Sequence, residues 1–344
     1  MSGIEAAVAA NPRARAHLAE IVVRFRELGI VLALVIVVAG TSIDNSLFLS
    51  STSLQQLLSG AAIVALLAIG ETLVIVTRNV DLSIGSVLGL SAYAVGAIYV
   101  HHPHVNLMLV ILAGAGVGLA CGIVNGAIVT LCRVPSLVVT LGTLYVIRGL
   151  DASWAGGNQI NSSSLPDTFN QLGYGKLLGV PYLGIITIVC VIIATYGMRT
   201  FRSGRDLYAI GSNPEAARLA GIPVDLRVFA TFAVSGAIAG FAGVLWLAFF
   251  GSVDSTAGTG YEFEVVAAVV VGGVAIFGGS GSVLGAALGA LLLNTIASSL
   301  VVINVSSYWV QAIQGALLIV AIAFDRLISL RLAPALRTRR STRE

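Results

Sequence analysis

The chain has 344 residues, of which 57% are hydrophobic and only 10% are charged, and its mean hydropathy is +0.96. Soluble globular proteins carry about 25% charged residues, so this chain has too little charge to cover the surface of a soluble protein of its size. The composition therefore excludes a soluble enzyme, a disordered regulator and a nucleic-acid-binding domain. It predicts an all-α polytopic membrane protein that lies in the lipid bilayer.

Ten runs along the chain are predicted as transmembrane helices, which need about 20 mostly apolar residues. The N-terminal segment 1–27 contains four arginines, and no small-residue cleavage site follows it, so we interpret the first run as a retained signal anchor. The first, eighth and tenth runs are short or weakly bounded, and a broken or re-entrant segment is an alternative for the eighth. The predicted helices are Leu28–Ile43, Leu57–Thr77, Ile84–Val100, Val105–Leu131, Val134–Leu150, Tyr182–Met198, Val228–Phe250, Val265–Phe277, Val283–Ile303 and Tyr308–Phe324.

The distribution of basic residues predicts how these helices are oriented, because cytoplasmic loops carry an excess of Lys and Arg. If the N-terminus is cytoplasmic and ten helices alternate, 17 of the 19 basic residues are cytoplasmic, and only Arg148 and Lys176 are not. Moving the count by one helix would destroy this separation. We therefore predict that both termini are cytoplasmic, that residues 28–325 form the transmembrane domain and that 326–344 form a basic cytoplasmic tail.

No motif in the chain supports ATP or metal chemistry. A phosphate-binding P-loop needs a lysine followed by Ser or Thr, whereas the single lysine, Lys176, is followed by Leu177. The four histidines form no HExxH motif, and three of them (His101, His102 and His104) are predicted to lie in a solvated loop. We predict no metal site and no enzymatic activity, and any ATP and Mg²⁺ must be bound by a partner.

Ionisable residues inside the predicted spans are costly in lipid and often mark a pathway. Glu71, in the second predicted helix, could serve as the proton site of a secondary carrier. Alternatively, it is paired within the bundle or solvated near the inner surface beside Arg78. Asp81 and Ser83 precede the third predicted helix, where they are expected to cap its free N–H groups.

Polar side chains inside apolar helices are the candidates for a translocation route. Amides and hydroxyls can exchange hydrogen bonds with a hydroxyl-rich solute, and they can equally tie helices together. Arg148 either extends outward to the membrane surface or faces a polar path and pairs with Asp151. The candidate residues are Asp81, Ser83, Asn125, Thr140, Thr143, Arg148, Asn294 and Gln311.

The cytoplasmic connection 199–227 contains a complete set of helix start and stop signals. Asn213 and Pro214 begin the predicted helix, Glu215 complements its dipole, and Gly221 ends it. We predict a two-turn helix with alanines and leucine on one side and charge on the other, suited to a groove in another protein. The residues assigned to this contact are Asn213, Pro214, Glu215, Ala216, Ala217, Arg218 and Gly221.

Several ordered blocks of the sequence resemble the permease subunits of bacterial ABC importers for ribose-type sugars. The blocks are TRNVDLSIGSVLGL at 77–90, NGAIVTLCRVPSLVVTLGTLYVIRGL at 125–150, GRDLYAIGSNPEAARLAGI at 204–222, the Gly-rich stretch 258–290 and VSSYWVQAIQGALLI at 305–319. The likeness extends from about Leu54 to Asp325. The triplet Thr-Arg-Asn at 77–79 looks more like the rhamnose and autoinducer-2 branches, because ribose permeases commonly have Gly-rich residues there.

The resemblance implies a type II ABC importer-like permease fold in the bacterial inner membrane. It implies two permease subunits side by side, identical or related, with two cytoplasmic ATP-binding subunits and a periplasmic or lipoprotein sugar-binding protein. It also implies that residues 213–221 form the coupling helix seated on the ATPase. The expected function is import of a monosaccharide or a related small polyol-like solute. A branched-chain amino-acid ABC permease and a proton-coupled carrier using Glu71 are the alternatives.

Overall fold

The computed structural model describes residues 12–306 and, beyond them, residues 308–310, 312–313, 315–316, 319–320 and 323, with side chains described from residue 27 onward. Most of the described residues are helical, and each described strand contains two residues. The helices are α2 Pro12–Asp44, η1 Ser46–Leu49, α3 Ser51–Val76, α4 Ile84–His101, α5 Leu107–Leu131, α6 Ser136–Ala155, η2 Ser162–Ser164, α7 Asp167–Tyr174, α8 Tyr182–Thr200, α9 Arg202–Ser212, α10 Pro214–Leu219, α11 Val224–Phe250, α12 Tyr261–Val271 and α13 Val283–Val302. The strands β1 Ile160–Asn161 and β4 Ser252–Val253 form one antiparallel pair, and β2 Lys176–Leu177 and β3 Val180–Pro181 form another.

Seven described helices are long and apolar enough to cross a membrane, so the chain is a polytopic all-α membrane protein. They coincide with seven of the ten predicted spans. Their bounds are Glu27–Asp44, Ser51–Val76, Ile84–His101, Leu107–Leu131, Tyr182–Thr200, Val224–Phe250 and Val283–Val302.

The other three predicted spans differ from this group in different ways. The run Val134–Leu150 lies in α6, whose 20 residues include Arg148 and Asp151, so α6 is long enough to span but less apolar. The run Val265–Phe277 is a helix only as far as Val271, and an 11-residue α12 covers about half of a bilayer. The alternative of a broken eighth segment is therefore correct, since Gly272 and Gly273 end the helix. Of the 17 residues of Tyr308–Phe324, ten are described and these are helical, whereas the tail 326–344 lies outside the described residues.

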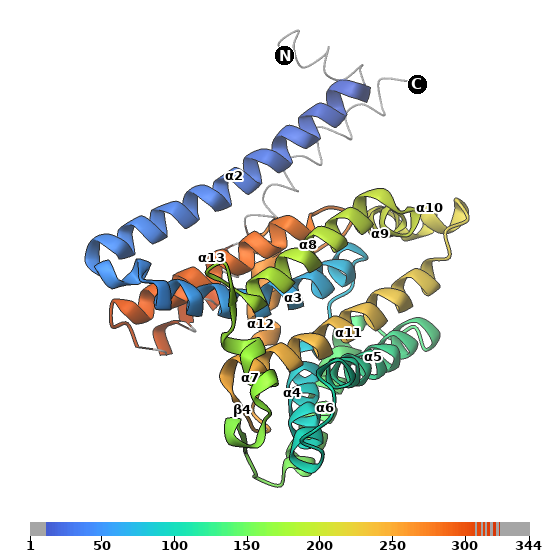
Figure 1. The fold of residues 1–344 in the computed structure, drawn as a ribbon. Coiled ribbons are helices and arrows are strands. Elements are labelled where there is room, and N and C mark those ends of the chain that lie inside the picture. The colour runs from blue at the N-terminus through green and yellow to red at the C-terminus, as the bar shows by residue number, and fades with distance from the viewer. Residues whose placement is uncertain are drawn as a thin grey trace, which may run out of the picture.

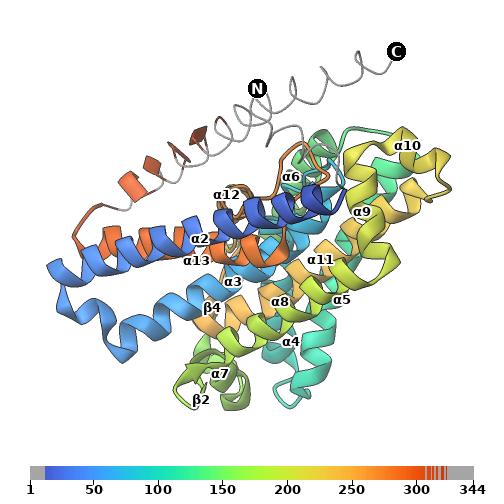
Figure 2. The same ribbon diagram turned by 90° about the horizontal axis from the view of Figure 1, so that it is seen from above.

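The connections between helices gather at two opposite ends of the bundle (Figures 1 and 2). At the end that carries α9 and α10, Gly279 donates its N–H to Val76 O (2.9 Å), and Tyr208 donates its hydroxyl to Gly281 O (3.0 Å). Burial raises the pKa of Tyr208, so this phenol remains a donor at neutral pH. At the end that carries α7, β1 pairs with β4, and Gln55 donates its side-chain amide to Tyr174 O (3.1 Å). We name these the α10 end and the α7 end.

The closest helix pair in the bundle is α5 against α11, and glycines at four-residue intervals make the approach possible. On α5, a β-carbon at Gly114, Gly118 or Gly122 would overlap atoms of α11. A β-carbon at Gly118 would strike the carbonyl of Gly236, and one at Gly240 would strike the carbonyl of Gly114. Small residues at this spacing let membrane helices pack backbone to backbone, which accounts for much of the high glycine content of the chain.

The same order of elements occurs twice, in opposite directions across the bundle. The long helix α3 is followed by the break 77–83 and then α4, and the long helix α11 is followed by the break 251–260 and then the shorter α12. The helices α3 and α11 are antiparallel, because α3 ends and α11 begins at the α10 end (Figure 1). Inverted repeats of this kind are common in transporters, and their interrupted helices form the sites near the membrane midplane.

Candidate functional site

Four buried polar residues meet where α4 begins. Asp81 donates its backbone N–H to Glu71 Oε1 (3.1 Å), and Ser83 donates its hydroxyl to Asp81 Oδ1 (2.6 Å). Asn125 of α5 donates its side-chain amide to Ser83 Oγ (2.8 Å). None of the four residues is more than 1% exposed. Because Asp81 is bonded to Glu71, more than a turn before the end of α3, the break 77–83 turns back into the bundle and α4 begins inside it.

Two predictions about these residues are wrong. Ser83 is the N-cap residue of α4, but its side chain makes no capping hydrogen bond. Its hydroxyl instead donates to Asp81, which also accepts the N–H of Ser83 (3.0 Å). Glu71 is not paired with Arg78, whose guanidinium donates to the carbonyls of Gly211 and Ser212. Glu71 is bonded within the bundle through Oε1, while its Oε2 has no hydrogen-bond partner among the described residues.

The helix α6 holds the break 77–83 from another side. Val80 donates its N–H to Ser136 Oγ (3.2 Å), and Thr140 donates its hydroxyl to Ser136 O (2.9 Å) and Val80 O (3.3 Å). Four of the eight route candidates, namely Asp81, Ser83, Asn125 and Thr140, therefore surround one break. The sequence analysis missed Ser136, which follows Pro135 and has no distinguishing signal in the sequence.

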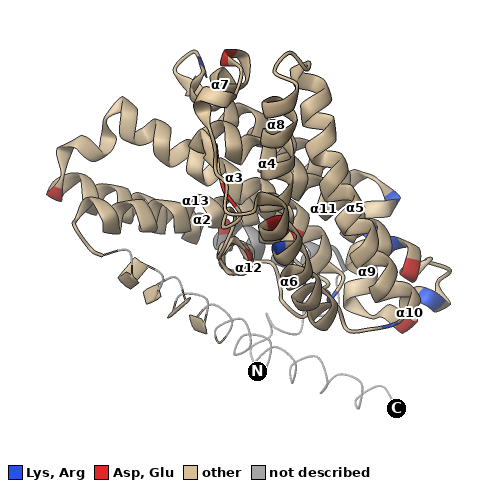
Figure 3. Ribbon diagram, turned by 90° about the horizontal axis from the view of Figure 1, so that it is seen from below, with Lys and Arg blue, Asp and Glu red and all other residues tan. Residues whose placement is uncertain are grey.

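A second group of buried charges lies between α4, α6 and α12, where Figure 3 shows acidic and basic residues close together inside the bundle. Arg148 donates from Nη1 to Ala257 O in the break 251–260 (2.5 Å). Arg148 interacts electrostatically with Asp151 and Glu262, but within the described part of the chain it forms no ion pair with either. The predicted direct pairing of Arg148 with Asp151 is thus absent, because the backbone of the break takes the guanidinium instead.

The break 251–260 meets α4 at this second group. The break 251–260 lies directly on the first turns of α4, where Gly85 and Gly89 have no side chain. A β-carbon on Gly85 would overlap Gly258 O and Glu262 Oε2, and one on Gly89 would overlap Ala257 O. The break 251–260 is therefore in backbone contact with the first turns of α4, and Arg148 of α6 is bonded to the same break.

The three remaining route candidates are not part of either group. Thr143 donates its hydroxyl to Thr140 O within α6 (3.3 Å), which is a bond inside one helix. Asn294 of α13 lies against Gly60 of α3, so its amide is at a helix contact. Gln311 lies outside the described residues.

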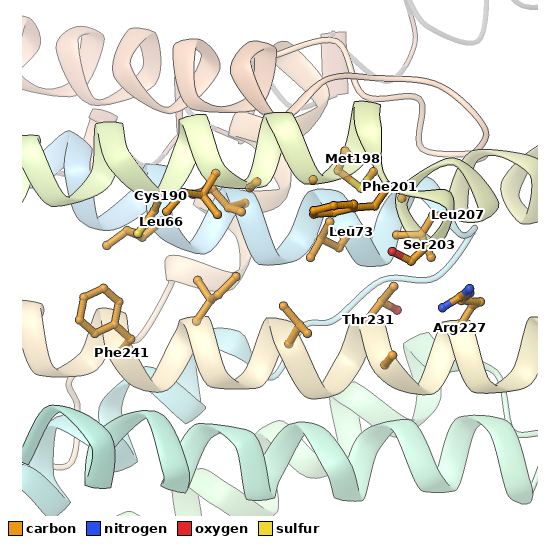
Figure 4. Close-up of a pocket in the computed structure, with 18 residues that line it drawn as sticks. Leu66, Leu73, Cys190, Met198, Phe201, Ser203, Leu207, Arg227, Thr231 and Phe241 are labelled. Atoms are coloured by element: carbon orange, nitrogen blue, oxygen red, sulfur yellow. The ribbon is translucent and has the colours of Figure 1, made fainter. Parts of the chain in front are cut away.

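Two cavities of opposite character open on the bundle. A groove of 390 Å³ between α3, α8, α9 and α11 is lined mainly by apolar side chains such as Leu66, Leu73 and Phe241, with Ser203 and Arg227 at one end (Figure 4). Such a lining suits hydrocarbon chains. A polar pocket of 230 Å³ lies over the break 251–260, and its lining is Gln159, Trp246, Phe250, Ser252, Val253, Asp254, Thr256, Ala257, Gly258, Thr259 and Tyr261. The polar pocket is therefore the better match for a hydroxyl-rich solute.

The helix α10 begins and ends where the sequence predicts. Asn213 Oδ1 accepts the N–H groups of Glu215 and Ala216 (both 3.1 Å), and Pro214 occupies the first turn. Gly221 has φ +78° and donates its N–H to Arg218 O (3.0 Å). The predicted face of alanines and leucine is wrong, however. Ala217 is buried against the bundle, whereas Leu219 is 91% exposed on the outer side with Glu215, Ala216 and Arg218.

The fold and the two buried polar groups define a class of protein before any comparison is made. A multi-pass bundle that is interrupted by inverted breaks and carries a capped helix projecting at one end is a component of a membrane transporter. Comparison with known proteins then gives the family. The model of the family described as "Branched-chain amino acid transport system / permease component" matches residues 53–322, and the chain belongs to this family.

Several relatives are similar over most of their length. The chain is 34% identical over 318 residues to the autoinducer 2 import system permease protein LsrC of Escherichia coli (strain K12 / DH10B), covering 92% of each protein. It is 35% identical over 300 residues to the same-named protein of Escherichia coli O157:H7, covering 87% of this chain and 86% of the relative. It is 34% identical over 318 residues to that of Salmonella typhimurium, covering 92% and 90%. No solved structure matches the chain.

These comparisons confirm the expected class of protein. The chain is a permease component of a transport system and not an enzyme. Together with the seven apolar helices, they make it a multi-pass protein of the inner membrane. They also confirm the resemblance to the ABC permeases that include the autoinducer-2 branch.

Proposed function

We propose that this chain is the membrane-spanning permease subunit of an ABC importer that carries a monosaccharide or a related small polyol-like solute inward. Two such subunits, identical or related, stand side by side with two ATP-binding subunits, which bind ATP and Mg²⁺. A periplasmic or lipoprotein sugar-binding protein delivers the solute. The permease has a type II importer-like fold with ten passes, the eighth of them broken at α12, and both termini are cytoplasmic.

The orientation rests on the positions of the basic residues in the described structure. Arg78, Arg133 and the five arginines of the segment 199–227 all lie at the α10 end, whereas Lys176 lies at the α7 end. The α10 end is therefore cytoplasmic by the positive-inside rule. The N-terminal segment 1–27 and the tail 326–344 are assigned to the same side.

The single observation that carries the proposal is α10 itself. A helix of six residues rarely persists without packing, yet α10 is capped at both ends and projects from the cytoplasmic end with Leu219 exposed. Its capping signals and the bond from Arg218 to Asp225 of α11 (2.8 Å) fix its position relative to the bundle, while Glu215, Ala216 and Leu219 stay exposed on its outer side. We assign residues 213–221 to contact with the ATP-binding subunit and the loop 199–227 to coupling.

The solute class rests on the relatives and on the polar pocket. The relatives that match over 92% of the chain are named as autoinducer 2 import permeases, whereas the family description names branched-chain amino acids. The pocket over the break 251–260 combines Gln159, Asp254 and Thr256 with Trp246 and Tyr261. Such a mixture of polar and aromatic side chains fits a hydroxyl-rich solute better than an aliphatic amino-acid side chain.

Reconstitution tests the proposal directly. Proteoliposomes would contain the permease, the ATP-binding subunit and the solute-binding protein encoded beside it, with ribose, rhamnose, autoinducer 2 and leucine as labelled solutes. We expect ATP-dependent uptake of a sugar-type solute with no imposed proton gradient. Uptake of leucine alone would favour the amino-acid alternative. Uptake driven by a proton gradient without the ATP-binding subunit would overturn the proposal in favour of a secondary carrier.

A further inference from the structure

The second group of buried charges contains carboxylate oxygens that no atom of the described chain satisfies. Both oxygens of Asp151 and Oε2 of Glu262 have no hydrogen-bond partner within the described residues. Asp151 is 1% exposed and Glu262 is 6% exposed. Buried polar atoms nearly always have a partner, and an unpaired buried carboxylate is costly. These oxygens are therefore strong acceptors that the fold itself leaves available.

The two carboxylates interact with a guanidinium most of whose N–H donors have no partner among the described residues. Arg148 interacts electrostatically with both Asp151 and Glu262, and the single hydrogen bond found for it in the described structure goes to Ala257 O. A guanidinium has five N–H donors, so Arg148 can still donate to a ligand. The group thus offers two buried carboxylates as acceptors near a half-buried donor.

The polar pocket adjoins this group through the break 251–260. Ala257 lines the pocket and accepts the hydrogen bond of Arg148. Asp254 also lines the pocket and interacts electrostatically with Asp151. A volume of 230 Å³ is smaller than that of the pockets that hold drug-sized ligands, so it suits a small solute.

The charges of this region discriminate between classes of solute. Asp151, Asp254 and Glu262 are opposed by Arg148 alone, so an anionic group would meet repulsion from three carboxylates. A zwitterionic amino acid also brings an ammonium group that these carboxylates attract, so the charges disfavour only a solute with net negative charge. A neutral polyhydroxylated solute instead donates its hydroxyls to the carboxylates and accepts from the guanidinium, while Trp246 and Tyr261 offer apolar ring surface.

We propose that Asp151, Glu262 and Arg148 form a binding site for the hydroxyl groups of the transported solute, where the break 251–260 lies on the first turns of α4. This inference rests on the proposed function and names residues for it. The solute reaches the site from the polar pocket, and it must part the break 251–260 from Gly85 and Gly89 of α4 to occupy it. The bond from Arg148 to Ala257 therefore holds this contact closed until a solute competes for the guanidinium.

Uptake kinetics in the reconstituted system test this site. The variants Asp151→Asn and Glu262→Gln keep the shape of each side chain and remove its charge. Asp167→Asn is the matched control, because Asp167 is an exposed acid on α7 at the same end of the bundle and outside the pocket. For whichever of ribose, rhamnose or autoinducer 2 the unmodified permease carries, we expect KM to rise about tenfold or more in each site variant. Asp167→Asn and the basal ATPase rate should stay within about twofold.

A binding measurement on the permease complements the kinetics. The chain has three tryptophans, and Trp154→Phe with Trp309→Phe leaves Trp246, which lines the polar pocket, as the single one. Titration with the carried sugar should change the fluorescence of Trp246, and Glu262→Gln should weaken that response by a similar factor. If the Asp151→Asn variant fails to insert into the membrane, the Glu262→Gln variant and this titration still test the site.

The outcomes separate the two proposals. If the unmodified permease takes up solute and both site variants keep KM within about twofold, the site is wrong and the importer function stands. If the unmodified permease takes up leucine alone, or takes up solute without the ATP-binding subunit, the proposed importer function is wrong and the site, which rests on it, is wrong as well.

Discussion

Arg78 is bonded to Gly211 across 133 positions of sequence, at the end of the helix that leads into α10. Its Nε donates to Gly211 O (2.5 Å), and its Nη2 donates to Ser212 O (2.6 Å). These carbonyls end α9, where a cation complements the helix dipole. Arg78 itself has φ +68°, which is uncommon for a residue other than glycine. A residue held in this conformation links the cytoplasmic connection to the break 77–83.

This link offers a physical route from ATP hydrolysis to the solute path. The residue after Ser212 caps α10, so under the proposed function a movement of α10 on the ATP-binding subunit would displace the carbonyls that Arg78 holds. Arg78 stands three residues before Asp81, which is bonded to Glu71 and Ser83 where α4 begins. The first turns of α4 in turn contact the break 251–260. One chain of contacts therefore joins α10 to both breaks.

Replacing Arg78 should uncouple ATP hydrolysis from uptake. We expect Arg78→Ala to lower uptake at least tenfold, because two hydrogen bonds to a charged group, each typically about 1.5–3 kcal/mol, are lost. The Arg78→Lys variant should have an intermediate uptake rate, since lysine keeps the charge but cannot donate to both carbonyls in the same geometry. Uptake and ATPase rates measured on the same proteoliposomes check this, with the basal ATPase rate expected within about twofold of the unmodified value.

Arg205→Ala is the matched control for Arg78. Arg205 lies on α9, is exposed and donates to Thr200 O (2.6 Å) without touching the break. It should support normal uptake. Normal coupling in Arg78→Ala would show that the link between α9 and the break 77–83 has no part in transport.

Leu219 should be required for contact with the ATP-binding subunit. It is 91% exposed on the outer side of α10, so its apolar side chain is not stabilised by packing on the bundle. We expect Leu219→Glu to abolish both binding of the ATPase and solute-stimulated hydrolysis, measured by co-purification and phosphate release. The permease itself should be unaffected, because surface substitutions usually change the free energy of unfolding by no more than about 0.5 kcal/mol.

A second exposed leucine provides the control for Leu219. Leu178 is 97% exposed at the α7 end, between β2 and β3. Leu178→Glu should leave ATPase binding unchanged. Equal effects of the two substitutions would contradict the assignment of α10.

Substitutions at Glu71 distinguish the proposed importer from a proton-coupled carrier. Its Oε1 accepts the N–H of Asp81, and a glutamine keeps a carbonyl oxygen there, so Glu71→Gln should transport normally. Glu71→Ala would leave that N–H unsatisfied in a buried place, at a cost of about 1–3 kcal/mol. A thermal melt of the purified protein and the uptake assay check both variants. Loss of uptake in Glu71→Gln with an unchanged melt would favour proton coupling.

The sequence predicts the parts of this fold that depend on local composition. Long apolar runs give α3, α5, α8, α11 and α13, and the signals around Asn213 and Gly221 give α10 with its ends. The depth of α4 could not be predicted, because the run 84–100 is apolar enough to look like an ordinary span. Only the bond from Asp81 to Glu71 shows that α4 begins inside the bundle. The sequence allows Arg148 either to extend outward or to pair with Asp151, whereas its hydrogen-bond partner in the described structure is a backbone carbonyl 109 residues away.

The proposed orientation of the chain in the membrane can be tested by labelling introduced cysteines. With the α10 end cytoplasmic, a cysteine at position 219 should be protected from a membrane-impermeant maleimide in intact cells, and one at position 178 should react. Both variants are made with Cys132→Ser, because Cys132 is an exposed native thiol at a helix end. Cells opened before labelling give the control, in which both positions should react because both leucines are more than 90% exposed. Labelling of position 219 but not 178 in intact cells would reverse the membrane topology, and α10 could then not meet a cytoplasmic ATPase.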